Sequence, residues 1–201
     1  MSERFSDAQI RTRFRRDYYA KLGSLIAPEF AALLYDHVTA RCEGVSGSGS
    51  KLAGLEDVAE GYADPSMEHL LRGVLPCVEI LTGLELSPTY SFFRLYRRGG
   101  ILPPHQDREA CEIGVSVHLG QSGNHPWPLW VKGPNGQSAV DLGPGEALIY
   151  RGIECQHWRE ALAEDQYAQI FLHYVDKNGP YREWRFDKRA SLGIGDPTPA
   201  Q

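Results

Sequence analysis

The chain has 201 residues, of which 42% are apolar and 23% are charged, and its formal net charge at pH 7 is −5. This composition is typical of a globular protein, and the acidic balance argues against a nucleic-acid partner, because phosphate contacts need a basic surface. No apolar run approaches the roughly 20 residues that a membrane-spanning helix needs, so the sequence predicts no membrane partner.

The length favours a single domain over residues 1–201. The four cysteines are scattered and none forms a C-x-x-C pair, so a structural zinc site is not expected. The first residues hold no apolar stretch of the kind found in secretory signals. Reduced cysteines and the lack of such a stretch favour a cytoplasmic location.

Residues 1–87 are expected to be helical. A helix capped by Ser6 or Asp7 is predicted from Asp7 to Leu25, because apolar side chains recur every four residues along it. The stripe consists of Ile10, Phe14, Tyr18 and Leu22.

A second predicted helix begins near Pro28, since proline is typical of a first helical turn. Its expected buried face consists of Phe30, Leu33, Leu34, His37 and Val38. The Gly44–Ser50 segment that follows predicts a flexible loop, either a lid or a connector. A third helix begins at Pro65 and is expected to kink or break at Pro76.

Residues 88–187 change in character, because short β-rich segments there are separated by glycine and proline turns. Strands are predicted at residues 90–96, 112–119, 128–132, 146–151, 155–159 and 167–175. Many short strands with regular turns indicate a sandwich or barrel, so the fold class is α+β. The Gly- and Pro-containing residues 188–201 are expected to form a loose tail.

A possible metal site lies within this strand-rich part. His105 and Asp107 are two residues apart, so on a strand their side chains point to the same face. His157, in a later β-rich segment, is the best candidate for a third ligand. Two histidines and one carboxylate can hold one face of an octahedral Fe(II) ion and leave the other face open.

Two segments around these residues resemble a known family. Tyr96-Arg-Arg-Gly99, followed by His105-Gln-Asp107, is similar to the Y-x-x-G-x(5)-H-x-D stretch of the prolyl-4-hydroxylase-like branch of the 2-oxoglutarate- and Fe(II)-dependent oxygenases. The segment from Gly145 to Tyr150, ahead of His157, is similar to the one before the family's distal histidine. The resemblance covers residues 89–175.

The resemblance implies a double-stranded β-helix (jelly roll) with the N-terminal helices packed on one sheet. It implies that His105, Asp107 and His157 bind Fe(II), and that 2-oxoglutarate and dioxygen are cosubstrates. The expected activity is hydroxylation of a C–H bond in a small-molecule or peptidyl substrate, with release of succinate and CO2. Relatives that transfer halide have a small residue in place of the carboxylate, so Asp107 favours hydroxylation.

The far carboxylate of 2-oxoglutarate would need a buried cation. The family's usual position, about ten residues after the distal histidine, holds Tyr167 here, which carries no charge. Arg159, on the same strand face as His157, is the first candidate for the anchor, and Lys132 is the second. Tyr96 matches the family tyrosine that hydrogen-bonds the cosubstrate, and His173 is a candidate for contact with cosubstrate or substrate.

Other interpretations remain open from the sequence. A cupin-like metalloenzyme that does not use 2-oxoglutarate would share the jelly roll and the histidines. A non-catalytic β-sandwich that binds a ligand or partner would use the histidines only structurally. The substrate stays undefined, although Arg94, Arg97 and Arg98 near the metal strand would suit an acidic one.

Overall fold

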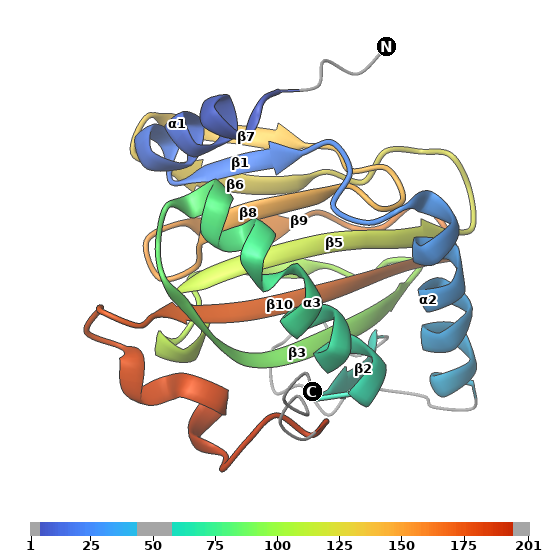
Figure 1. Cartoon of the computed structure of the whole chain (residues 1–201). Helices are drawn as coiled ribbons and strands as arrows, with labels where there is room; N and C mark the ends of the chain where they lie inside the picture. Colours follow the sequence, from blue (N-terminus) through green and yellow to red (C-terminus); the bar gives the residue numbers. More distant parts are fainter. Residues whose placement is uncertain (1–4, 44–57, 195–201) are drawn as a thin grey trace.

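The computed structural model describes residues 5–43 and 58–194 of the chain, and Figure 1 gives the arrangement of its helices and strands. The Gly44–Ser50 segment, for which the sequence predicted a flexible loop, lies outside the described residues. No helix in the described parts is both long and apolar enough to cross a membrane.

Residues 5–43 and 58–194 contain three α-helices, whose bounds follow from the residues at their ends. Helix α1 (Asp7–Asp17) begins after Ser6, whose side chain forms a capping box with Gln9. Helix α2 (Pro28–Arg41) begins at a first-turn proline, as predicted. Helix α3 (Pro65–Thr82) is capped by the carboxylate of Asp64 and ends at Gly83, whose φ of 72° suits glycine.

The first helix is shorter than the sequence predicted. Tyr18 adopts a left-handed conformation with φ of 67°, and the chain then enters strand β1 (Tyr19–Leu22). Leu22 is buried from this strand rather than from a helix. The apolar spacing of four residues runs from α1 into β1 without a change. A helix and a strand can both place residues four apart on one face, so this spacing did not reveal where the helix ends.

Two further helix predictions need correction. In α2, Leu34 and Val38 are buried, but Phe30 and Leu33 are 43% and 65% exposed, so the apolar face is narrower than predicted. In α3, no break occurs at Pro76, since the helix continues to Thr82. Residues on both sides of Pro76, including Leu71 and Val78, are buried in the core, so both halves of the helix pack against the rest of the protein.

In the described part of the chain, ten strands form two antiparallel sheets. The six-stranded sheet has the order β1-β8-β5-β10-β3-β2, and the four-stranded sheet has the order β4-β9-β6-β7. After β1, the strands are β2 (Val58–Tyr62), β3 (Leu86–Arg97), β4 (Leu102–His105), β5 (Ile113–Gln121), β6 (Leu129–Gly133), β7 (Gly136–Val140), β8 (Ala147–Arg151), β9 (Gln156–Arg159) and β10 (Gln166–Asp176). Two 3-10 segments, η1 (Glu109–Cys111) and η2 (Arg182–Lys188), complete the elements.

The connectivity of β3 to β10 is that of a jelly roll, as predicted. Four of these eight strands lie in each sheet, and the chain repeatedly crosses from one sheet to the other as it proceeds. Strands β1 and β2, which come from the part expected to be helical, extend the larger sheet at its two edges. The predicted strand positions after residue 88 are confirmed, and β7 is an addition. The strand expected at His105 is β4, which ends before Asp107.

The helices cover one face of the six-stranded sheet, where Figure 1 shows α3 crossing β10 and β3. On β10, the residues Ala168, Ile170, Leu172 and Tyr174 belong to the core between this sheet and the helices. Because side chains alternate along a strand, Tyr167, Gln169, Phe171 and His173 face the interior between the two sheets. Strand β10 therefore supplies both a structural face and a functional one.

The segment after η2 differs from the expected loose tail as far as it is described. Leu192 is only 5% exposed and belongs to the main core. Arg189 donates to the Oε1 atom of Glu68 at 2.6 Å, and the backbone N–H of Gly193 donates to Oε2 of the same side chain. The fully buried carboxylate of Glu68 on α3 thus fixes residues 189–193.

Candidate metal centre

His105 and His157 meet across one ladder of the four-stranded sheet. Strand β4 pairs with β9 so that His105 lies directly opposite His157, and the centroids of the two imidazole rings are 4.2 Å apart. Asp107 follows two residues after β4 ends. The sequence expected Asp107 on the strand itself, whereas the carboxylate reaches the same place from the loop after it.

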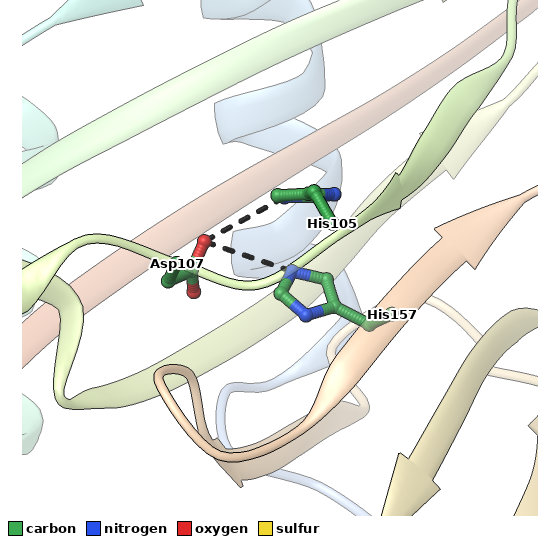
Figure 2. Close-up of side chains that lie close together, drawn as sticks. All are labelled: His105, Asp107 and His157. Carbon is green, nitrogen blue, oxygen red and sulfur yellow. Dashed lines mark ion pairs between the residues drawn. The ribbon is translucent and has the colours of Figure 1, made fainter.

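The three side chains converge on one point, as Figure 2 shows. The Oδ1 atom of Asp107 lies 3.6 Å from Nε2 of His105 and 3.7 Å from Nε2 of His157. These separations are longer than hydrogen bonds. They approach the spacing of about 3 Å between neighbouring donor atoms that each lie about 2.1 Å from one metal ion. The three groups could therefore share an ion after a small contraction.

The backbone orients both imidazole rings. Nδ1 of His105 lies 2.9 Å from the carbonyl oxygen of Pro103, and Nδ1 of His157 lies 3.0 Å from that of Cys155. A carbonyl oxygen can only accept, so each Nδ1 carries the hydrogen. In the neutral ring, Nε2 then keeps its lone pair and faces Asp107, which is the form that binds a metal.

The turn between β8 and β9 fixes Asp107. The backbone N–H of Asp107 donates to the carbonyl of Gly152 at 2.9 Å. A side chain at position 152 would collide with the Asp107 carboxylate and with the carbonyl of Cys111. The Oδ2 atom of Asp107 is buried and has no hydrogen-bond partner among the described residues. An unpaired buried carboxylate oxygen is costly, and a bound cation would remove that cost.

The protonation states of the ligands favour a cation. Burial raises the pKa of Asp107, but the imidazoles around it, His105 first among them, more than offset this and hold the pKa below its ordinary value. Burial lowers the pKa of His157, which keeps that ring neutral. At His105, burial also lowers the pKa, but the negative charge of the nearby Asp107 carboxylate and the hydrogen bond to the carbonyl of Pro103 outweigh it, so the net shift is upward. Of the two histidines, His105 is therefore the one at which a proton would compete more with a metal ion.

A cavity of about 270 Å³ opens beside these three side chains. Its walls are rich in aromatic groups from the larger sheet, and two arginines also reach it. The wall residues are Tyr90, Phe92, Arg94, Arg108, Tyr150, Phe171 and His173.

His173 lies where the sequence placed it, on the cavity side of β10. It is 5% exposed, and its ring lies 4.7 Å from that of Tyr90. Its Nδ1 atom is buried without a partner among the described residues. Burial lowers the pKa of His173 to about 4, so the ring is neutral. A second group of possible ligand atoms combines His173 with Asp107 and Cys111, and it shares the carboxylate with the first group.

Arg159 is a buried arginine without an acidic partner. It is 2% exposed, and none of the ion pairs among the described residues includes it. Its guanidinium group donates to the carbonyl of Trp127, to the hydroxyl of Tyr167 at 3.3 Å and to Oε1 of Gln169 at 3.1 Å. Its Nε atom has no partner in the described part of the chain.

Polar groups gather around Arg159 inside the jelly roll. The ring of Tyr96 packs edge-on against that of Trp127, which lies under the Arg159 guanidinium group. The buried hydroxyl of Tyr96 has no hydrogen-bond partner among the described residues, and it lies toward Arg94, whose pKa it helps to raise. His118 stacks on Tyr167 with the two rings 4.2 Å apart, and its Nε2 atom also lacks a partner. Gln169 donates to the hydroxyl of Ser116. This cluster does not line the cavity at the triad, although Arg159 lies only two residues along β9 from His157.

Lys132 differs from the expectation. Strand alternation buries its neighbour Val131 in the interior, so Lys132 is exposed on the outer face of the four-stranded sheet. Its register partner Gln156 is likewise exposed. Lys132 is therefore not a candidate for the anchor.

The predicted arginine cluster does not form an anion site. Arg97 donates to the backbone carbonyl of Cys42, and Arg98 pairs with Asp165 at the surface. Arg94 instead lines the metal cavity, where it pairs with Glu60 of β2 at 3.2 Å. This pair could not be predicted from the sequence, because its partners are 34 residues apart on different strands. The positions of Arg108 and Tyr150 in the cavity wall were also not predicted from the sequence.

Comparisons with known proteins give matches in structure only. No protein-family model matches the chain, and no curated protein matches it in sequence.

Several solved structures match most of the chain. SnoN, a non-heme alpha ketoglutarate dependent epimerase from nogalamycin biosynthesis, has a TM-score of 0.73 at 13% identity, over 97% of this chain and 92% of SnoN. SnoK, a non-heme alpha ketoglutarate dependent carbocyclase that is also from nogalamycin biosynthesis, has a TM-score of 0.72 at 11% identity, over 100% of this chain and 98% of SnoK. A Pseudomonas putida prolyl-4-hydroxylase has a TM-score of 0.67 at 14% identity, over 84% of this chain and 99% of the hydroxylase. The chain therefore has the fold of the 2-oxoglutarate-dependent non-heme oxygenases.

Proposed function

We propose that the protein is an Fe(II)- and 2-oxoglutarate-dependent dioxygenase. It hydroxylates a C–H bond of a small-molecule or peptidyl substrate and releases succinate and CO2. The observation that carries this proposal is the convergence of His105, Asp107 and His157 with both Nε2 atoms directed at the carboxylate. The fold supports it, since one solved structure of SnoN contains Fe3+ and alpha ketoglutarate.

Bound iron would supply the activation of dioxygen and the oxidation of 2-oxoglutarate. The residues of this chain provide the geometry. His105, Asp107 and His157 would hold the ion through three donor atoms, which would leave coordination positions for the cosubstrates. Tyr150, whose ring lies 4.8 Å from that of His157, packs against the ligand on the interior side and limits its movement. The buried walls of the cavity keep bulk water from the reacting groups.

Arg159 is the proposed anchor for the far carboxylate of 2-oxoglutarate. It lies on the same face of β9 as His157, about 7 Å along the strand, a distance comparable to the length of this five-carbon diacid. A buried guanidinium group without a counterion gains most from a carboxylate. The hydroxyl of Tyr96 is a proposed donor to the cosubstrate, and His173 is a proposed contact beside the metal.

Arg94 is the competing anchor, because it lines the cavity and is also largely buried. Its charge is already matched by Glu60, so a second carboxylate would gain less there. Arg159 is preferred for this reason.

Neither alternative function accounts for the same features. A cupin-like site usually has more histidine ligands. Among the described residues, the groups of possible ligand atoms around Asp107 combine it either with His105 and His157 or with Cys111 and His173. A purely structural role would leave Oδ2 of Asp107 and the guanidinium group of Arg159 buried without partners that match their charge.

The test uses the full chain, purified without metal. Fe(II) and 2-oxoglutarate are added aerobically with ascorbate, and succinate is measured with and without candidate substrates. Succinate that forms only with the metal and disappears in His105→Ala supports the proposal. Metal binding without affinity for 2-oxoglutarate would favour the cupin-like alternative, and the absence of specific metal binding would favour the binding module.

A cytoplasmic location is part of this proposal. All four cysteines are unpaired in the structure, as is usual in a reducing compartment.

A further inference from the structure

The walls of the metal cavity consist mainly of flat, apolar rings. Phe92 on β3 and Phe171 on β10 are register partners, and their ring centroids are 6.2 Å apart. Next along the same strands, Tyr90 packs against His173, and the His173 ring is parallel to that of Phe171 within 1°.

Arg94, the first of two cations at the cavity, is neutralised within the fold. Its Nε atom donates to Oε2 of Glu60 at 3.2 Å, and both side chains are largely buried. The guanidinium carbon lies 5.1 Å from the ring centroid of Phe92 and 5.8 Å from that of Phe171. The flat guanidinium group of Arg94 therefore lies against the aromatic rings of the wall. Because Glu60 pairs with it, little of its charge is left for a ligand.

Arg108, the second cation, is neutralised more completely. Its two terminal nitrogens donate to the two oxygens of Asp187 at 2.8 and 2.9 Å, which is a bidentate pair. The hydroxyl of Tyr62 donates to Asp187 at 2.7 Å and adds to the network. The guanidinium carbon lies over the rings of Tyr90, at 4.9 Å, and Trp184, at 5.6 Å.

These contacts set the charge that a substrate meets. Apart from the Asp107 carboxylate, which belongs to the metal, each charge at the cavity wall is paired with its opposite among the described residues. An anionic substrate would have to displace Glu60 or Asp187 or remain unpaired, and a cation would meet Arg94 and Arg108. Either case is unfavourable in a partly buried site.

We infer that the substrate presents an uncharged aromatic or conjugated ring to the metal centre, held between the rings of β3 and β10. This inference rests on the proposed function and names the substrate class of the same site. Acidic molecules, which the arginine-rich sequence near residues 94–98 suggested, are excluded by the pairing of the arginines.

The first experiment compares two probes that share one ring system. Naphthalene-2-methanol is uncharged, and 2-naphthoate carries a carboxylate on the same ring. Calorimetry is done without oxygen on protein loaded with Co(II) and 2-oxoglutarate, so that no turnover occurs. Naphthalene-2-methanol should bind at least about tenfold more tightly. Equal or tighter binding of 2-naphthoate, or no binding of naphthalene-2-methanol, would overturn the inference.

The second experiment reverses the preference. Asp187→Asn removes the counterion of Arg108 and leaves an unmatched guanidinium group at the cavity. Affinity for 2-naphthoate should rise, whereas that for naphthalene-2-methanol should change less. Asp165→Asn, which removes the exposed partner of Arg98, is the matched control and should change neither affinity.

A wall variant keeps the inference testable if Asp187→Asn perturbs the fold. Phe171→Ala should weaken binding of both naphthalene probes at least about tenfold, whereas Phe30→Ala, at an exposed phenyl ring, should not. Unchanged binding by Phe171→Ala would contradict the ring site.

The two proposals fail in different ways. Binding of Co(II) and of 2-oxoglutarate is measured by the same calorimetry before any probe is added. Protein that binds both but neither naphthalene would overturn the substrate class and leave the proposed function intact. Protein that binds naphthalene-2-methanol but not 2-oxoglutarate would overturn the proposed function.

Discussion

The main chain orients the two histidines of the proposed triad. Each imidazole donates from Nδ1 to the carbonyl two residues before it, Pro103 for His105 and Cys155 for His157. No side-chain substitution elsewhere removes these acceptors. The tautomer of both histidines therefore follows from the strand conformation. The position of the Asp107 carboxylate depends instead on the space left by Gly152, which has no side chain. The guanidinium group of Arg159 is held by hydrogen bonds to three uncharged groups. A bound carboxylate could replace some of these hydrogen bonds.

Arg159→Leu tests the anchor. We expect the dissociation constant of 2-oxoglutarate to rise at least about tenfold, corresponding to about 1.4 kcal/mol, because a charge-assisted contact is lost. Metal binding should be unchanged, since Arg159 does not contact the triad. Calorimetry of Co(II) and 2-oxoglutarate measures both.

Arg98→Leu removes a surface arginine that pairs with Asp165 and serves as the control. If Arg159→Leu binds 2-oxoglutarate normally while Arg94→Met does not, the anchor is Arg94.

At the scale of elements, the turn between β8 and β9 shapes the site. Gly152 lies at the end of β8 and accepts from the N–H of Asp107, while its own N–H donates to the carbonyl of Glu112 at 3.0 Å. Its missing side chain is required by close approach, because a Cβ would lie 2.5 Å from Oδ2 of Asp107. The element that presents His157 thus also limits where the carboxylate can lie.

Gly152→Ala should weaken metal binding by at least about tenfold, because either the Asp107 carboxylate or the turn must move. Titration with Co(II), followed by its absorption spectrum, measures the change. An unchanged affinity would mean that the turn relaxes without moving Asp107.

Gly73→Ala in α3 is the matched control. Nothing lies within 4 Å of a Cβ at that position, and alanine favours a helix interior over glycine by about 0.5–1 kcal/mol. Chemical denaturation should show this gain in the free energy of unfolding, with metal binding unaltered. A loss of stability would indicate that α3 does not tolerate the added methyl group.

The elements also show how far sequence can predict structure. Strand positions and the shared face of His157 and Arg159 were predictable, because they depend on local alternation along β9. The end of α1 was not, because the left-handed turn at Tyr18 leaves the apolar spacing unchanged. The neutralising pairs Arg94–Glu60 and Arg108–Asp187 join residues 34 and 79 positions apart, and no spacing rule gives such contacts.

At the scale of the whole molecule, the interior of the jelly roll contains a buried polar region around Arg159 and His118. His118 is 2% exposed and donates from Nδ1 to the carbonyl of Leu142 at 2.8 Å. Burial, reinforced by the positive charge of Arg159, lowers the pKa of His118 to about 4. Folding therefore keeps this ring neutral under conditions in which the unfolded chain would protonate it.

The stability of the metal-free protein should fall as pH drops from 7 to 5. Between the ordinary pKa of about 6.5 and the folded value of about 4, the unfolded state binds more protons at His118. This side chain should account for about 1–2 kcal/mol of the loss at pH 5. Urea denaturation across this range measures it.

His118→Gln should flatten the pH dependence, whereas His69→Gln, at an exposed histidine, should not. The same slope in His118→Gln and in the unaltered protein would contradict the assignment.

The proposed metal ligands and the rings of the cavity wall come from different sheets, and this separation has a practical consequence. The histidines of the triad belong to the four-stranded sheet, whereas the rings that enclose the cavity come mainly from β3 and β10 of the other. Randomising positions 90, 92 and 171 should therefore yield variants whose substrate selectivity changes while metal binding at the proposed triad is retained. The fold would then suit laboratory evolution, because the residues that face the substrate can change while the three proposed metal ligands stay the same.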